Sequence, residues 1–120
     1  KIKGADQTLL ITDAMMACGM PEGQYTLGGQ EVLSKNGAAR LLSGALAGSI
    51  LTMDQAVRNL RDHTSLPLED IIKMASLNGA KFIGLGHKKG KIALGYDADL
   101  IILSQDLQVQ EVFLEGKKFQ

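Results

Sequence analysis

A short apolar run near the start of the chain constrains its fold more than any other feature. Residues 8–13 read Thr-Leu-Leu-Ile-Thr-Asp, so the apolar side chains are continuous rather than alternating. Such runs are typical of strands covered on both faces, as in parallel sheets. The sequence predicts no second strand of this kind to pair with it. Because the chain also opens at Lys1 without an initiator methionine, we expect it to be a piece of something longer.

The next part of the chain predicts a loop and then a hairpin. Residues 14–23 carry two glycines and a proline, which favour a loop. Residues 25–27 lead into Gly28-Gly29, and the segments 31–34 and 39–42 flank Asn36-Gly37. Asn-Gly favours a type I′ turn because both positions tolerate a positive φ. We therefore expect antiparallel strands around this dipeptide.

Helices are predicted in the middle of the chain. Thr52 and Gln55 form a capping-box pattern, and apolar residues follow at helical spacing to position 60. A second helix is expected to start around Pro67 and to run to residue 75, since proline suits a first turn. Asn78-Gly79 is expected to break it before a further short helix at 80–85.

Short strands are expected at the end of the chain. Residues 86–99 are rich in turn formers, and residues 100–103 read Leu-Ile-Ile-Leu, a short buried strand. Residues 109–114 alternate in part and are expected to pair with 117–119 across Glu115-Gly116. The order of strand, hairpin, helices and short strands predicts a mixed α/β chain.

Composition narrows the function classes. The 120 residues contain 13 Lys and Arg against 13 Asp and Glu, so the formal net charge is zero. This balance argues against nucleic-acid or anionic-membrane binding through bulk charge. No apolar run approaches the roughly 18 residues that a membrane span needs, so we expect neither a nucleic acid nor a membrane as partner. The single Cys18 cannot form an internal disulfide, which favours the cytoplasm.

Asp13 is the first candidate for chemistry. It stands where the predicted strand ends and the glycine-containing loop begins. In barrels and open α/β sheets, catalytic groups lie at the carboxyl ends of strands. A carboxylate there can act as a general base or as a metal ligand. A turn or helix cap is the competing interpretation, since short polar residues are common at strand ends.

A run of small residues is the second candidate. Residues 44–49 read Gly-Ala-Leu-Ala-Gly-Ser and precede the first predicted helix. Small side chains let backbone N–H groups approach a ligand closely, so the run could cradle one. It lacks the Gly-Lys-Ser/Thr ending of a P-loop. A tightly packed connector explains it equally well.

The remaining reactive residues give weaker signals. His63 and His87 lack partners at metal-ligand spacing and are expected on the surface. Cys18 has no base placed near it and is expected to be a small buried residue. Solvated turns or core packing explain the other candidates better than phosphate, metal or pocket roles: Lys88, Lys89, Lys91, Asp97, Asp99, Met15, Met16 and Met20.

Three stretches carry a family resemblance. Residues 10–15 with residues 23–29 are similar to the last barrel strand and loop of N-acetylglucosamine-6-phosphate deacetylases. Residues 46–60 resemble the next signature of that family. Residues 89–100, Lys-Gly-Lys-Ile-Ala-Leu-Gly-Tyr-Asp-Ala-Asp-Leu, resemble a motif shared across the wider amidohydrolase superfamily. Together they span nearly the whole chain.

The resemblance implies a fold. The family consists of metal-dependent hydrolases with a (β/α)8 TIM barrel and a small β-sandwich domain built from both chain ends. Residues 1–86 would then supply the last strand, a hairpin insertion and the closing helices of the barrel. Residues 87–120 would supply the C-terminal part of the sandwich. The chain would be the C-terminal portion of such an enzyme.

The resemblance also implies a reaction, the hydrolysis of the acetamide of N-acetylglucosamine 6-phosphate to glucosamine 6-phosphate and acetate. A divalent metal, zinc or iron, would activate the water, with ligands mostly outside this chain. Asp13 would be the catalytic carboxylate and a possible metal ligand. Leu46, Ala47 and Gly48 would contact the phosphorylated amino sugar, and the intact cytoplasmic enzyme would be a homodimer.

Because the implied metal ligands lie elsewhere, these 120 residues alone are expected to be inactive. Two alternatives stay open. The chain could belong to another amidohydrolase-superfamily hydrolase, since the third motif fits several of them. It could also be a non-catalytic structural module, if it is natural as it stands and Asp13 is only a cap.

Overall fold

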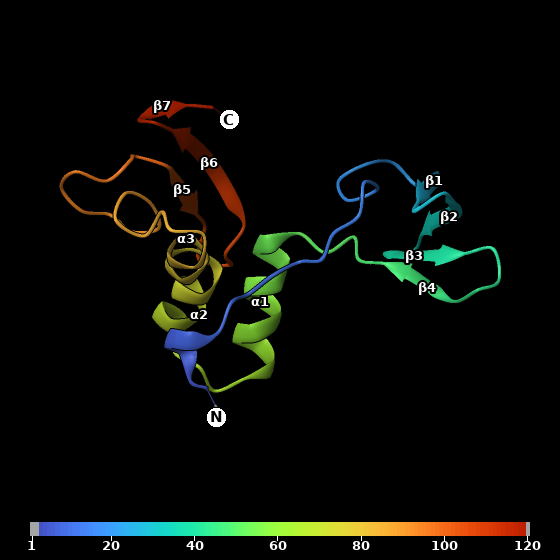
Figure 1. Cartoon of the computed structure of the whole chain (residues 1–120), viewed down its shortest axis with the longest axis horizontal. Coiled ribbons are helices and arrows are strands. Elements are labelled where there is room, and N and C mark those ends of the chain that lie inside the picture. Colours follow the sequence, from blue (N-terminus) through green and yellow to red (C-terminus); the bar gives the residue numbers. More distant parts are fainter. Residues whose placement is uncertain (1–2, 120) are drawn as a thin grey trace. The chain divides into compact units, whose positions relative to one another are not determined.

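The computed structural model describes residues 3–119 and has the predicted mixed α/β character (Figure 1). The chain divides into two compact units. Residues 11–55 form one unit, and, among the described residues, 3–10 together with 56–119 form the other. Among the described residues, no helix is long and apolar enough to cross a membrane.

The unit of residues 11–55 is built on a four-stranded antiparallel sheet in the order β1-β2-β3-β4. Its strands are β1 (Gly23–Leu27), β2 (Gln30–Lys35), β3 (Ala38–Leu41) and β4 (Leu46–Gly48). Asn36 and Gly37 have φ values of 53° and 74°, so the predicted positive-φ turn between β2 and β3 is confirmed. Successive hairpins therefore connect the whole sheet.

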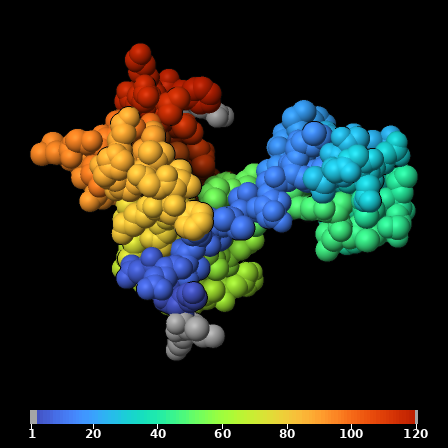
Figure 2. Space-filling model, in the orientation of Figure 1, coloured from blue at the N-terminus to red at the C-terminus, as the bar shows by residue number. Residues whose placement is uncertain are grey.

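The core of this unit lies on one face of the sheet. Val32 and Ala39 are completely buried, and Met15 and Ala17 from the preceding loop pack against them. In Figure 2 the blue residues of this loop lie against the cyan and green strands. The sequence predicts a ligand cradle or a packed connector for residues 44–49, whereas the structure places strand β4 there. It pairs with β3 through an irregular register at Ala39 and Arg40.

The buried strand predicted at residues 8–13 does not form in this structure. Among the described residues, this segment belongs to no strand; Leu10 N donates to Met74 O at 3.0 Å, and Ala14 forms one parallel bridge with Ser49. A strand needs a continuous ladder of hydrogen bonds to a neighbour, and the described chain places no strand beside these residues. Ile11 is accordingly 68% exposed.

The helices of the other unit follow the predicted periodicity. They are α1 (Met53–His63), which follows Thr52 and belongs to this unit from residue 56 on, and α2 (Leu68–Ala75), which is preceded by Pro67 at a φ of −64°. Ile71 of α2 is completely buried against Val57 of α1 and Leu107. The apolar stripes of the two helices thus form the core of this unit.

The third helix corrects the predicted break at Asn78-Gly79. Helix α3 spans Leu77–Phe82 and includes both residues. Asn78 is buried, and its Nδ2 donates to Ala5 O at 2.7 Å and to Thr8 O at 2.8 Å. These bonds to a segment far away in the sequence outweigh the low helix propensity of Asn and Gly. The break falls instead at Ser76.

A second antiparallel sheet ends the chain, and the strands predicted at residues 100–103 and 109–114 are confirmed. The prediction that residues 100–103 are buried is wrong, because this small sheet leaves Ile101 and Ile102 about half exposed. Its order is β5-β6-β7, formed by β5 (Leu100–Leu103), β6 (Val109–Leu114) and β7 (Lys117–Lys118). The turn between β6 and β7 contains Glu115 and Gly116, both with positive φ. Gly116 N donates to Ala98 O at 3.0 Å, which fastens this turn to the segment that precedes β5.

Candidate functional site

The candidate site is a pocket of about 750 Å³ within the unit of residues 11–55. Asp13 and β4 line it together, and further lining comes from Gly37, Ala38, Ser49, Ile50, Leu51, Thr52 and Gln55. The structure therefore brings the predicted catalytic residue and the predicted substrate-binding residues Leu46, Ala47 and Gly48 into one pocket.

Asp13 has an unusual backbone. Its φ is 51°, in the left-handed region that costs a non-glycine residue about 1–2 kcal/mol. Aspartate is among the residues that tolerate this region best. The side chain is exposed, and no described residue forms a hydrogen bond or ion pair with its carboxylate. The carboxylate is therefore free to accept a proton or to bind an incoming group.

Backbone hydrogen bonds hold the two halves of the pocket together. Met15 N donates to Ser49 O at 2.8 Å, and Ala14 forms a parallel bridge with Ser49. Asp13 lies next to this bridge on one side, and β4 ends next to it on the other. Main-chain hydrogen bonds thus join two halves that lie far apart in the sequence, and the Cys18 side chain adds contacts to Ile50 O and Leu51 O.

Strand β4 is an edge strand of its sheet, because only β3 neighbours it in the strand order. Leu46 is exposed, whereas Ala47 and Gly48 are half-buried. Edge strands present backbone N–H and C=O groups that no neighbouring strand occupies. Small residues here leave these backbone groups accessible from the pocket.

A metal site does not form from the described residues alone. Across residues 3–119, no three His, Cys, Asp or Glu side chains are grouped so that they could hold an ion. His63 and His87 are both exposed, as predicted. Within the described part of the chain, Asp13 is the one acidic residue that lines the pocket.

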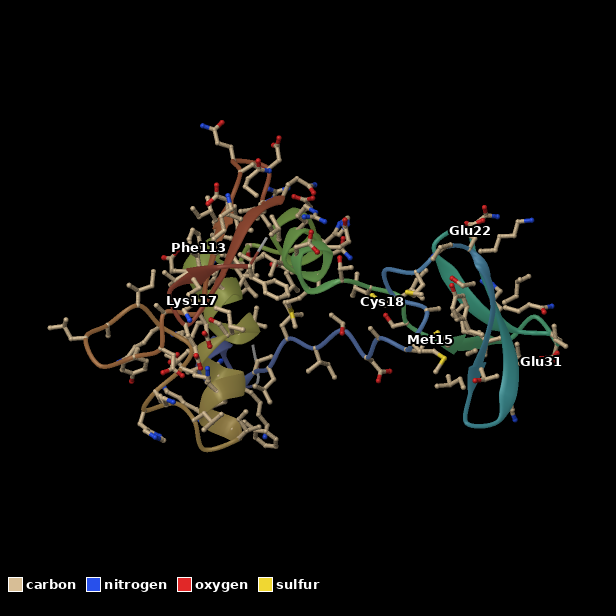
Figure 3. All side chains as sticks on the ribbon, turned by 90° about the horizontal axis from the view of Figure 1, so that it is seen from above. Met15, Cys18, Glu22, Glu31, Phe113 and Lys117 are labelled. Carbon is tan, nitrogen blue, oxygen red and sulfur yellow. The ribbon has the colours of Figure 1, made fainter. Side chains whose placement is uncertain are left out.

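The sulfur-containing candidates differ in how deeply the structure buries them. Met15 belongs to the core, while Met16 and Met20 are exposed, so core packing explains only the first. Cys18 is half-buried, and its Sγ lies 3.4 Å from Ile50 O. Met15 and Cys18 both belong to the loop that precedes β1 (Figure 3).

The lysine-rich turn and the Asp97-Ala98-Asp99 segment are tied to each other. Lys89 Nζ lies 2.8 Å from Asp97 Oδ2 and also pairs with Asp99, and Lys88 Nζ lies 3.4 Å from Asp97 Oδ2. The bond from Lys89 holds the pKa of Asp97 below its ordinary value, and a bond from the same lysine lowers the pKa of Asp99. Their charges are thus matched locally, which agrees with the structural interpretation.

Several lining residues are not marked by any pattern in the sequence. Asn36-Gly37 predicts the turn correctly, but nothing in the local pattern indicates that Gly37 and Ala38 line the same pocket as Asp13. The spacing of Gln55 predicts only a capping box. Placing Gly37 and Ala38 beside the other lining residues requires the pairing of β3 with β4, which is non-local information.

Comparison with known proteins shows which family the chain resembles. The model of the Amidohydrolase family matches residues 10–119. N-acetylglucosamine-6-phosphate deacetylase of Lysinibacillus sphaericus is 50% identical over 117 residues, which are 98% of this chain and 30% of that protein. N-acetylgalactosamine-6-phosphate deacetylase of Escherichia coli O157:H7 is 42% identical over 112 residues, which are 93% of this chain and 30% of that protein.

A solved structure is also similar. N-acetyl-D-glucosamine-6-phosphate deacetylase of Mycobacterium smegmatis, a mutant in complex with N-acetyl-D-glucosamine-6-phosphate, superposes with a TM-score of 0.84 at 36% identity. The match covers 96% of this chain and 31% of that one. The chain thus spans about 30% of the length of each of these proteins. With a family model that matches almost all of its residues, the chain belongs to the amidohydrolase family.

Proposed function

We propose that this chain is the C-terminal part of an N-acetylglucosamine-6-phosphate deacetylase and supplies its catalytic carboxylate. The observation that carries the proposal is that Asp13 shares one pocket with Leu46–Gly48 and has no partner there among the described residues. The identity of 50% to a relative with this name supports the choice of reaction.

The proposed architecture follows from the same resemblance. Residues 1–86 would contribute to a (β/α)8 barrel, and residues 87–120 to a small β-sandwich. In a barrel, neighbouring strands on either side would pair with residues 8–13. The apolar side chains of this segment, among them the exposed Ile11, would then be covered as the sequence predicts.

Asp13 is proposed to move a proton in two directions. Its carboxylate takes a proton from the water that attacks the acetamide carbonyl, and then gives that proton to the amine that leaves. A positioned acid/base group of this kind contributes about 10²–10⁴-fold to the rate. Its exposure to the pocket and the lack of a competing cation among the described residues suit this role.

Strand β4 is proposed to bind the sugar through its backbone. The outer edge of Leu46–Gly48 offers N–H and C=O groups that β3 does not use. Hydroxyl groups of an amino sugar match such donors and acceptors. The small Ala47 and Gly48 let the sugar approach these groups closely.

A divalent metal such as zinc or iron would add Lewis-acid activation of water. Because no metal site forms among residues 3–119, we propose that its ligands lie mostly outside this chain, with Asp13 as a possible additional ligand. The proposed proton transfers involve Asp13 alone among the residues of this chain. We expect the 120-residue chain by itself to release no acetate.

The cellular setting is part of the proposal. One cysteine, unable to form an internal disulfide, agrees with a reducing cytoplasm. The proposed partner is a phosphorylated amino sugar, and the intact enzyme is proposed to be a homodimer.

The decisive experiment assays the full-length protein for acetate release from N-acetylglucosamine 6-phosphate. N-acetylgalactosamine 6-phosphate, cyclic amides and adenine serve as competing substrates, because another amidohydrolase would prefer one of them. Asp13→Asn is expected to lower turnover by about 10²-fold or more, while circular dichroism stays unchanged. Turnover near the wild-type level in this variant would exclude the role of Asp13.

A further inference from the structure

Met15 lies directly behind the substrate-binding strand of the proposed site. Its side chain is 8% exposed and belongs to the core formed with Ala17, Val32 and Ala39. Its backbone N donates to Ser49 O at 2.8 Å, and its Sδ lies 3.3 Å from Ala17 N. Met15 thus contacts Ala17 in its own loop and also Ser49, which directly follows β4.

Gly48 is the point where this contact is tightest. A Cβ added at Gly48 would lie 3.2 Å from Met15 Cγ, 3.4 Å from Met15 Cβ and 3.3 Å from Leu27 Cδ2. Gly48 does not have a positive φ, so space rather than backbone conformation calls for glycine. The absence of a side chain lets β4 sit against Met15 at a shorter distance than any other residue would allow.

We infer that Met15 is a positioning residue that sets the distance between Asp13 and the backbone of Leu46–Gly48. It follows Asp13 by two residues, so its amide and side chain connect the position of the acid/base group to that of β4. This inference rests on the proposed function. It goes beyond it by assigning a role to a buried side chain that touches no substrate.

The chemistry explains why such a contact matters. Acid/base catalysis requires the carboxylate to lie within hydrogen-bond reach of the reacting atoms. Small displacements of bound substrate relative to a catalytic group lower rates steeply, and about 1 Å can cost about 10²-fold. A methyl group at Gly48 forces either Met15 or β4 to move by a few tenths of an ångström.

The chain offers a matched control. Gly23 begins β1 in the same unit, lacks a positive φ, and a Cβ added there would meet nothing within 4 Å. Gly23→Ala therefore makes the same chemical change in the same sheet without the contact to Met15. Both variants lose the same conformational freedom in the unfolded chain.

The experiment measures kcat and KM of the full-length protein for N-acetylglucosamine 6-phosphate. Gly48→Ala is expected to lower kcat/KM by about fivefold or more, while Gly23→Ala stays within about twofold. Met15→Leu, which keeps a Cγ in contact, is expected to retain activity, whereas Met15→Ala loses part of it. Met15→Ala is expected to lower kcat/KM less when it is introduced into Gly48→Ala than when it is introduced into the wild type, because the two residues share one contact.

Two results would overturn the inference. One is Gly48→Ala behaving like Gly23→Ala in kcat/KM, and the other is the losses from Met15→Ala and Gly48→Ala multiplying independently. Amide exchange of Met15, measured by NMR, separates this inference from the proposed function. If the wild type is inactive, the function fails. Faster Met15 exchange in Gly48→Ala but not in Gly23→Ala would still support the coupling, and equal exchange would reject it.

Discussion

Two kinds of aspartate occur in this molecule, and their surroundings differ. Asp13 lines a pocket, has a left-handed backbone, and has no partner for its carboxylate among the described residues. Asp97 and Asp99 share Lys89, and Asp99 Oδ1 also accepts a hydrogen bond from Glu115 N at 3.0 Å. The carboxylate of Asp13 is therefore accessible to solvent and ligands, whereas the charges of Asp97 and Asp99 are balanced by a lysine of the same fold.

The difference shows how to sort acidic residues that look alike in a sequence. All three follow or precede a predicted strand within turn-forming segments. A carboxylate with a matched cation and backbone donors stabilises its own loop, because its charge is already satisfied. A carboxylate that lines a pocket without a cation or hydrogen-bond donor beside it does not stabilise the fold, and it is therefore a candidate for function.

The largest expected effect comes from replacing one aspartate of each kind by asparagine. Asp13→Asn is expected to lower turnover by about 10²–10⁴-fold with little change in melting temperature. Asp97→Asn is expected to do the reverse, lowering the melting temperature and leaving turnover within about twofold, since it removes only the structural ion pairs with Lys88 and Lys89. Steady-state kinetics and thermal melts of both variants check this. Loss of turnover in Asp97→Asn with an intact fold would break the comparison.

A buried amide gives the next largest effect. Asn78→Ala removes the donors to Ala5 O and Thr8 O, and leaving buried polar groups unsatisfied costs about 1–3 kcal/mol. Chemical denaturation should show this loss in the free energy of unfolding. Amide exchange should localise it to residues 3–10 and α3. The exposed His63→Ala in α1 is the control and should stay within about 0.5 kcal/mol of the wild type.

Asn78 also shows where prediction from the sequence ends. Helical periodicity and Pro67 placed α1 and α2, and Asn36-Gly37 placed a hairpin, because each signal is local. The break expected at Asn78 was wrong because its side chain bonds to residues at the other end of the chain. The strand expected at residues 8–13 is absent from the structure for a related reason, since a strand depends on a neighbour that no local pattern supplies.

The candidate site, like the fold, could be predicted from the sequence only in part. The position of Asp13 after an apolar run marked it from the sequence, but only family resemblance connected it with Leu46–Gly48. The structure brings these residues into one pocket and adds Gly37, Ala38 and Gln55. The positions of Gly37 and Ala38 depend on strand pairing across the sheet, and the contact between Met15 and Gly48 depends on packing at the level of single atoms.

The smallest expected effect is a dependence of stability on pH. The pKa of Asp97 and that of Asp99 lie below the ordinary 3.8 because Lys89 bonds to both. Their contribution to stability is therefore present above pH 3.8 and lost as the pH falls through the lowered values. The pKa of Lys89 is raised above 10.5 by the bonds to Asp97 and Asp99, so its contribution is present below pH 10.5 and lost above the raised value.

Melting temperatures measured across the acid range test this dependence. Lys89→Met is expected to flatten the acid decline relative to the wild type, because both aspartates lose the same partner. Lys91→Met is the control, since Lys91 Nζ lies over the Tyr96 ring at 4.7 Å. Equal acid declines in the two variants would show that the ion pairs do not set the stability of this loop.

The bridge between Ala14 and Ser49 has a consequence for the order of folding. Strands β1 to β4 follow one another through short turns, so each hairpin closes a small loop and forms quickly. The contact of Met15 with Ser49 joins residues on opposite sides of all three hairpins and has a much larger closure entropy. The pocket is therefore expected to assemble last, which makes its formation a sensitive report of late folding in this unit.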